Sequence, residues 1–569
     1  MSQENDPLAQ EKELLTSVEN ASTSEKIKTY TKLSGPGWLQ GAITLGGGSL
    51  AGSLYLGVIG GTQLLWLQPL MMIFGVLMLS VIGYVTLSTG KSPFQAINQH
   101  INPVLGWGWL IAAMLANLVW AMPQFSLGTA ALQQNLGILT DDPETGSQSG
   151  KYLCVAILFI VATVVVWMYD SKAAKVFDVI LKVLVGIIVL SFFGVVMVLA
   201  GELDWGAIAK GFIPDFSMLS QPAEKFREII AASSAPDYWN AEILKSQRKV
   251  MVTAAATAVG INMTFLLPYS MLRKGWGKEH RGLASFDLGM GLFIPFFLAT
   301  TCVVIASASQ FHGEYDEGLL DTSKPVPTAK LQKAYEKNLT GIQSHLGALE
   351  SPNHQDRQLA AMLVKRDANQ FALSLKKLEN LAGNETATAE ISSDKKSATQ
   401  IIFGIGVLGM AVSTIIILML INGFCLTEAL GTKMSGVVHR SGALLPGITG
   451  ALGFLFLWSN AQANFLLTVP TSIFGMVLLP IAYFTFFCMI NSKELMGDAL
   501  PKGGKRVALN LAMGLALVAA SIGAGWSIWN KAQWVGVGVV GAFILLVWFG
   551  HGYRKLNQKL DRIEDKLER

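Results

Sequence analysis

The sequence predicts an all-α polytopic membrane protein, and three observations support this fold class. Hydrophobic residues make up 51% of the 569 residues, whereas charged residues make up only 14%. The mean hydropathy is +0.44, a composition typical of membrane proteins rather than of soluble domains. The apolar residues gather in twelve runs. Each run is long enough for a membrane-spanning helix, which needs about 20 residues.

The chain divides into five segments. Residues 1–30 are polar and rich in Glu, Ser, Thr and Lys, so we expect a disordered cytoplasmic tail. Transmembrane helices 1–7 follow in 31–309, then a polar insertion at 310–398, helices 8–12 in 399–552 and a charged helical tail at 553–569. The expected spans are 36–60, 64–88, 104–133, 152–170, 177–201, 249–272, 286–309, 399–424, 441–459, 464–491, 506–529 and 532–551.

The first ten spans divide into two halves of five. The first half occupies 36–201 and is followed by a loop at 202–248. Secondary transporters are often built from two inverted repeats, and discontinuous helices at corresponding positions form their binding site near the bilayer midplane. In such a fold, the first span of each half is where a break would form the site.

Both of these spans contain helix-breaking residues. Gly46, Gly47 and Gly48 interrupt the first, and each glycine costs about 1 kcal/mol relative to alanine inside a helix. Pro268 in the sixth span removes a helical hydrogen bond and frees the carbonyl of Thr264. In lipid, a broken helix is tolerated where it lines a cavity or is buried in protein, and close helix packing is the other explanation for the glycines.

A break in each paired helix favours a substrate site. The predicted substrate-binding residues are Gly46, Gly47, Gly48, Ser49, Ile261, Asn262, Met263 and Thr264. Further candidates for lining the cavity are Thr44, Asn117, Gln124 and Ser472.

Basic residues in the short loops predict the orientation. They gather in the loops after the fourth, sixth, eighth and tenth spans, which lie on one side of a twelve-span arrangement. By the positive-inside rule both termini are cytoplasmic, in a plasma membrane such as the bacterial inner membrane. The 310–398 insertion is then extracytoplasmic. Helical spacing at 327–350 and 355–383 predicts a hairpin that could bind a partner.

The segment from Gly35 to Trp66 resembles the first-helix region of the Nramp family of divalent-metal transporters. It shares the opening Gly35-Pro36-Gly37, the aromatic Trp38 and the closing Leu64-Leu65-Trp66. The end of the tenth span, with Glu494-Leu-Met-Gly497, is similar to the family's tenth-helix exit. Over residues 35 to about 530, the resemblance implies a leucine-transporter-like fold of two inverted five-helix repeats plus two extra helices, working by alternating access.

The metal-binding residues of the family do not carry over. Its Asp-Pro-Gly-Asn motif is replaced by Gly46, Gly47, Gly48 and Ser49, and its Met-Pro-His motif by Thr264, Phe265 and Leu266. Around the family's tenth-helix glutamine, this chain has Ser472 and Leu478. The site therefore lacks both the carboxylate that would offset a dehydrated divalent charge and the thioether that favours transition metals. Because magnesium keeps several waters, hydrated magnesium is the best substrate; its ligands are not predicted.

Two other functions stay open. A glycine break presents backbone N–H groups at a half-helix N-terminus, which suits a small anion or a zwitterionic solute. The third possible function is that of a membrane sensor or scaffold that uses the outer hairpin. An enzyme is not expected, because no histidine lies at membrane depth beside a serine or a carboxylate. No cofactor and no nucleic acid are expected, and the partners are the transported ion or solute and membrane lipid.

Overall fold

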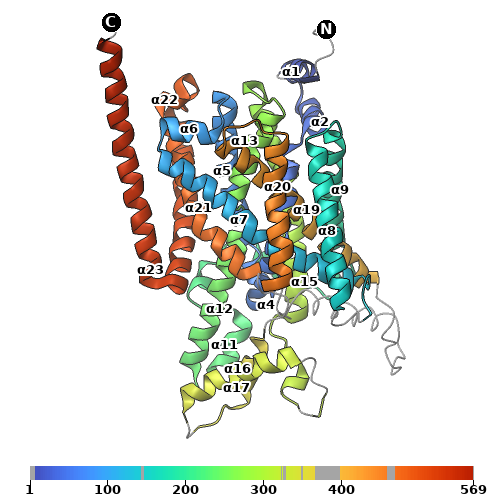
Figure 1. Ribbon diagram of the computed structural model, residues 1–569. Coiled ribbons are helices and arrows are strands. Elements are labelled where there is room, and N and C mark those ends of the chain that lie inside the picture. The colour runs from blue at the N-terminus through green and yellow to red at the C-terminus, as the bar shows by residue number, and fades with distance from the viewer. Residues whose placement is uncertain are drawn as a thin grey trace.

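The structure is a computed structural model that describes residues 7–18, 20–141, 147–321, 323–324, 329–347, 350–364, 398–457 and 468–567. Figure 1 shows a bundle of upright helices, with α1 (Pro7–Ser17) and the C-terminal part of α23 (Gly503–Leu567) at one end. We call this end the terminal face. The opposite end carries α11 (Glu224–Ala231), α16 (Ala329–Leu346) and α17 (His354–Met362), and we call it the insertion face.

The predicted all-α polytopic fold is confirmed. Within the described residues, ten helices are long and apolar enough to cross a membrane, or eleven if one bent pair counts as a span. The first half consists of α3 (Pro36–Thr44) with α4 (Gly47–Gly60), α5 (Leu67–Thr89), α7 (Pro103–Ala130), α8 (Gln148–Tyr169) and α9 (Ala174–Leu199). The second half consists of α12 (Pro236–Ala256) with α13 (Ile261–Arg273), α14 (Arg281–Leu288) with α15 (Ile294–Phe311), α19 (Ala398–Ala429), α20 (Val437–Leu452) and α21 (Thr468–Asn491).

The last two predicted spans form one bent element. Helix α23 changes direction at Gln533, whose φ of 44° and ψ of −130° are not helical. Figure 1 shows its two arms as a narrow V, so that the chain ends at the terminal face. The second arm continues as helix to Leu567, through the segment predicted as a charged tail.

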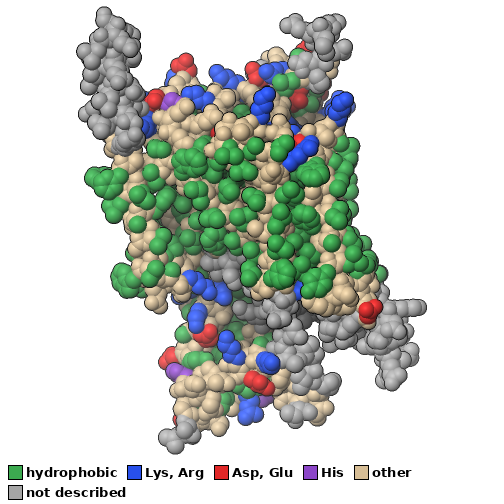
Figure 2. Space-filling view, viewed as in Figure 1, with side chains coloured by type: hydrophobic (Ala, Val, Ile, Leu, Met, Phe, Trp, Pro, Cys, Tyr) green, Lys and Arg blue, Asp and Glu red, His purple; other side chains and the backbone are tan. Residues whose placement is uncertain are grey.

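A wide belt of hydrophobic side chains surrounds the bundle, and charged side chains gather at its two ends (Figure 2). Large apolar side chains in this belt are well exposed, among them Leu190 at 70% and Ile522 at 67%. Such exposure would be unfavourable in water but costs little against lipid tails, which are as apolar as the side chains themselves.

The expected disordered tail at 1–30 is wrong for the residues that the structure describes there. Helices α1 and α2 (Thr23–Leu33) occupy this segment, and Ser22 begins α2 with a capping box. Leu15 and Val18 are buried, and the ring of Tyr30 meets that of Phe286 edge to face at 5.5 Å. The few apolar residues of this polar segment therefore pack against the rest of the protein, including the transmembrane helices.

The outer segments are more helical than predicted. Helix α12 begins at Pro236, so the sixth span is longer than the expected 249–272 and extends out of the bundle. Helices α16 and α17 lie within the predicted insertion, and the part of the expected second helix beyond residue 364 lies outside the described residues. The carboxylate of Asp356, which is fully buried, accepts hydrogen bonds from Ser234 Oγ and, at 2.7 Å, from Trp239 Nε1. This acid fastens the insertion to α12.

His312 lies just beyond α15, where its Nδ1 is 3.1 Å from the carbonyl oxygen of Val58. Burial lowers the pKa of its ring from 6.5 to about 4. Because the folded-state pKa is depressed, the ring contributes stability above pH 6.5 that is lost as the pH falls through about 4. We expect that loss to be about 3 kcal/mol.

The measurement is chemical unfolding of the wild type and of His312→Gln at about pH 7.5 and about pH 4. The variant should lose less stability than the wild type between the two conditions. Equal losses would contradict the assignment of this acid sensitivity to His312.

Candidate functional site

The first span is broken where its glycines predicted. Helices α3 and α4 meet at an angle of 53°, and Leu45 and Gly46 form the connection. The first amide groups of α4 find partners within the break: Gly46 N–H donates to Ser49 Oγ at 3.2 Å, and Gly47 N–H donates to Gln124 Oε1 at 3.0 Å. The unwound backbone is therefore satisfied without a continuing helix, as burial requires.

The break in the sixth span lies earlier than predicted. Helix α12 ends at Ala256 and α13 begins at Ile261, whereas Pro268 sits inside α13. The hydroxyl of Thr44 reaches across from α3 and lies 3.1 Å from the carbonyl oxygen of Thr257 and 2.9 Å from that of Ala258. One side chain of the first broken span thus bonds to the unwound carbonyls of the second.

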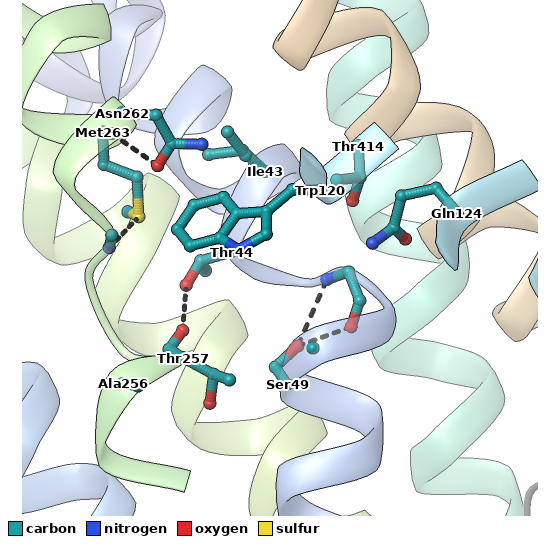
Figure 3. A pocket seen from close by; sticks show the side chains of 13 residues that line it. Ile43, Thr44, Ser49, Trp120, Gln124, Ala256, Thr257, Asn262, Met263 and Thr414 are labelled. Carbon is teal, nitrogen blue, oxygen red and sulfur yellow. Dashed lines mark hydrogen bonds between the residues drawn. The ribbon is translucent and has the colours of Figure 1, made fainter. Parts of the chain in front are cut away.

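A cavity of about 50 Å³ lies at this junction, with room for a few water molecules or for an ion that keeps part of its water shell. Figure 3 shows side chains from both breaks pointing into it, with Trp120 and Gln124 of α7 and Thr414 of α19. Its thirteen lining residues, all described, carry no charge: Ile43, Thr44, Gly46, Gly48, Ser49, Trp120, Gln124, Ala256, Thr257, Gly260, Asn262, Met263 and Thr414.

Two polar groups in this cavity have no hydrogen-bond partner. Asn262 is fully buried, and its Oδ1 accepts from the Met263 N–H at 2.9 Å while its Nδ2 is unpaired. Thr414 is 4% exposed, and its Oγ1 is unpaired as well. Buried polar groups are nearly always hydrogen-bonded, so these two atoms point to a ligand or to bound water.

Some predicted site residues lie elsewhere. The Thr264 hydroxyl donates to the carbonyl oxygen of Ile261 at 2.5 Å and accepts from Trp109 Nε1 at 2.9 Å. Both hydrogen bonds lie outside the cavity, so this hydroxyl is not available to a ligand there. Gly47 does not line the cavity itself but donates its N–H to Gln124, which does, and Ile261 is buried in the core. The amide of Asn117 pairs with Asn422 at 3.5 Å, as an interhelical contact. The side chain of Ser472 lies outside the described residues.

Sequence reasoning missed six residues of the cavity wall, namely Ile43, Trp120, Ala256, Thr257, Gly260 and Thr414. Trp120 could have been found, because it lies four residues before Gln124 and so shares a face of the same helix. Thr414 carries no comparable signal, since serine and threonine in transmembrane helices usually bond to their own backbone.

Aromatic rings close the route from the cavity to the terminal face. Along α13, the ring of Phe265 lies 4.6 Å from that of Trp109 and 4.4 Å from that of Tyr269. Tyr269 in turn stacks on Phe424 at 6.0 Å. All four side chains are fully buried, so this column is a closed barrier.

An ionic cluster lies beyond the rings at the terminal face. Asp170 follows α8, and its carboxylate lies 2.8 Å from Arg273 Nη2 and 2.9 Å from His439 Nδ1. The side chains of Asp170 and His439 are 2% and 1% exposed. The cluster ties the end of α13 to α8 and α20.

Within the described residues, no group of three or more His, Cys, Asp and Glu side chains could hold a metal ion.

The chain is similar to one protein family and to several solved structures. A family model described as natural resistance-associated macrophage protein-like, or Nramp, matches residues 37–336. A search of curated proteins finds no match. A point mutant of the Eremococcus coleocola manganese transporter is 13% identical, with a TM-score of 0.61, over 93% of this chain and 95% of that chain. The same transporter in complex with an aromatic bis-isothiourea substituted compound gives the same values.

These structural likenesses show the fold. They confirm the predicted leucine-transporter-like arrangement of two inverted five-helix repeats plus two extra helices.

Proposed function

This chain belongs to the Nramp family, and from that premise we propose that it is a secondary transporter that moves a divalent metal ion, with hydrated magnesium as the preferred substrate, by alternating access. The observation that carries the proposal is the uncharged cavity between the two broken helices. Solved structures of similar fold are of a manganese transporter, which supports a metal substrate but not the choice of metal.

The chemistry of the cavity favours a hydrated ion. A bare divalent cation would need carboxylates to offset the cost of its dehydration, and the cavity wall has none. A hydrated magnesium ion presents water hydrogens on its outside, so it needs acceptors rather than charges. The carbonyl groups at the ends of α3 and α12 are of that kind, because the last carbonyls of a helix have no intrahelical partner.

The closed terminal face supports alternating access. The aromatic column and the Asp170 cluster separate the cavity from that face, so release on that side requires α13 to move. We propose that the terminal face is cytoplasmic and that the protein lies in a plasma membrane, because the short loops at that face carry the basic residues. The outer insertion is then available to an extracytoplasmic partner.

A second candidate function is transport of a small anion or a zwitterionic solute. The N-cap residues of α4 and α13, Gly46 and Gly260, are both glycines of the cavity wall. Helix N-termini attract negative charge, and the unpaired Nδ2 of Asn262 is a further donor. A substrate carboxylate would fit these groups.

Uptake by proteoliposomes tests the metal proposal. We expect saturable magnesium uptake with weak or absent manganese uptake, because the wall offers manganese no carboxylate. Its one thioether, that of Met263, already accepts the N–H of Gly260 at 3.4 Å. Robust saturable manganese uptake by the wild type would contradict this ligand argument. Stabilisation in a thermal-shift screen by an anion or an amino acid alone, and by no divalent metal, would favour the second candidate.

A designed carboxylate provides the matched variant. Asn262→Asp keeps the shape of the side chain and replaces the unpaired Nδ2 with an oxygen. We expect its manganese uptake to rise about tenfold, which corresponds to about 1.4 kcal/mol of binding free energy. Asn117→Asp, outside the cavity, is the control and should bring no such gain.

A further inference from the structure

Helix α1 lies at the terminal face (Figure 1), where it contacts residues 274–280, the connection between α13 and α14. The side chain of Leu8 rests on Gly275, because a methyl group on that glycine would stand 2.8 Å from Leu8 Cδ2. One turn further along the same face of α1, Glu11 Oε1 lies 3.5 Å from His280 Nε2. An apolar and an acidic side chain of α1 therefore meet the two ends of this connection.

The ring of His280 is held in place as the partner of Glu11. Its side chain is 0% exposed and stacks on Trp276, with ring centroids 5.4 Å apart. Its Nδ1 accepts the N–H of Gly277 at 3.1 Å, so the hydrogen of the neutral ring is on Nε2, the atom next to Glu11. The connection thus presents a donor at the place where α1 brings a carboxylate.

Apolar burial adds to this contact. Leu15 is 6% exposed and Val18 is 9% exposed, although the segment around them is polar. Burial of such side chains is the main favourable contribution to docking. Because helices shorter than about 12 residues are marginal in water, α1, with 11 residues, depends on this docking for its helical structure.

Helix α2 joins the docked α1 to α3. Only Ser34 and Gly35 separate α2 from α3. On the way, the ring of Tyr30 packs against Phe286 of α14, and a methyl group on Gly282 would stand 2.9 Å from the Tyr30 hydroxyl. The two N-terminal helices therefore contact the segment that follows α13, the half-helix of one broken span, and continue directly into α3, the half-helix of the other.

We propose that α1 and α2 form an autoinhibitory contact that ties α3 to α13 and opposes opening of the terminal face. The contact is made in the closed arrangement described above, and movement of α13 would carry residues 274–280 away from α1. A contact present in only one of two states stabilises that state, so its loss shifts the population toward the open one. The opening rests on the proposed function, whereas the docking of α1 does not.

The rate at which a cysteine on α13 is modified tests this proposal in the full chain. Thr264→Cys is made in a background without native cysteines, and a charged thiol reagent is added to the purified protein without divalent metal. Leu8→Asp together with Leu15→Asp places two charges on the docked face of α1. We expect this double variant to be modified about tenfold faster, which is within the usual range of coupling between two sites.

The matched control is Ile27→Asp on α2. It makes the same change from an apolar to an acidic side chain in the same segment, but Ile27 is 49% exposed, so modification should keep the wild-type rate. Equal rates in the double variant and the wild type would overturn the proposal, as would a rise of the same size in Ile27→Asp. If the double variant does not fold, Leu8→Ser, which removes only the contact with Gly275, takes its place and should give a smaller rise.

The two proposals fail separately. Faster modification of the double variant without metal uptake by the wild type supports the autoinhibitory contact and overturns the metal-transport proposal. Saturable metal uptake with equal modification rates removes the autoinhibitory contact and leaves the transport function standing.

Discussion

Gly46→Val should reduce substrate uptake by about 100-fold or more, the scale of loss expected when a site is displaced by about 1 Å. The added side chain would collide with Thr414 and crowd the carbonyl of Ile43. Gly46 is buried and is the N-cap residue of α4, so making room for the side chain would require a shift of α3, α4 or α19 at the break. The measurement is initial uptake of the substrate metal by proteoliposomes with equal amounts of reconstituted protein.

The control for this variant is another glycine in a membrane helix. A side chain at Gly186 on α9 would meet no atom within 4 Å, so Gly186→Val should transport like the wild type. Wild-type uptake by Gly46→Val would remove the assignment of the cavity as the substrate site. Loss of folded protein in both variants would instead indicate a general intolerance of valine.

Asp170→Ala should destabilise the protein by about 3–5 kcal/mol, the usual cost of removing one partner of a buried ion pair. The change leaves Arg273 and the buried His439 without their shared carboxylate. It also leaves the hydrogen bond from Arg273 to the carbonyl oxygen of Tyr169, at 2.9 Å, as the remaining polar contact of this arginine with the end of α8, so the terminal face should open more readily. Thermal unfolding reports the first effect, and solvent access to Thr264, changed to cysteine in a background without native cysteines, reports the second.

An exposed ion pair is the matched control for Asp170→Ala. Glu242 and Lys245 lie 3.2 Å apart on the outer part of α12, and both side chains are well exposed. Exposed pairs contribute at most about 1 kcal/mol, so Glu242→Ala should unfold close to the wild type. An Asp170→Ala protein as stable and as closed as the wild type would show that the cluster does not hold the terminal face.

The first break could be predicted from the sequence because its cause is local. Three consecutive glycines weaken any helix, wherever they lie in a fold, and the structure interrupts the span there. The second break could not be located in the same way. Pro268 is the strongest local signal, yet it is accommodated inside α13, while the unwound residues Thr257 and Ala258 are held by Thr44. That contact joins residues more than 200 positions apart.

The same distinction applies to the cavity wall. Gly46, Ser49 and Asn262 lie at or next to the breaks, so local reasoning reached them. Thr414 enters from a helix of ordinary apolar sequence, and only the packing of α19 against α3 shows its place. The helices between residues 7 and 33 could not be predicted for a related reason, because their burial depends on partners such as Phe286 far along the chain.

The helix that begins at Pro236 has a mechanical consequence. Its 21 residues span about 30 Å, from the docked outer hairpin at one tip to Ala256 in the cavity wall at the other. Because α12 is this long, a small tilt near Ala256 displaces the docked insertion by a larger distance. In the proposed alternating-access cycle, an antibody fragment bound to α17 would therefore restrain the tilt of α12, and a fluorophore attached there would report it.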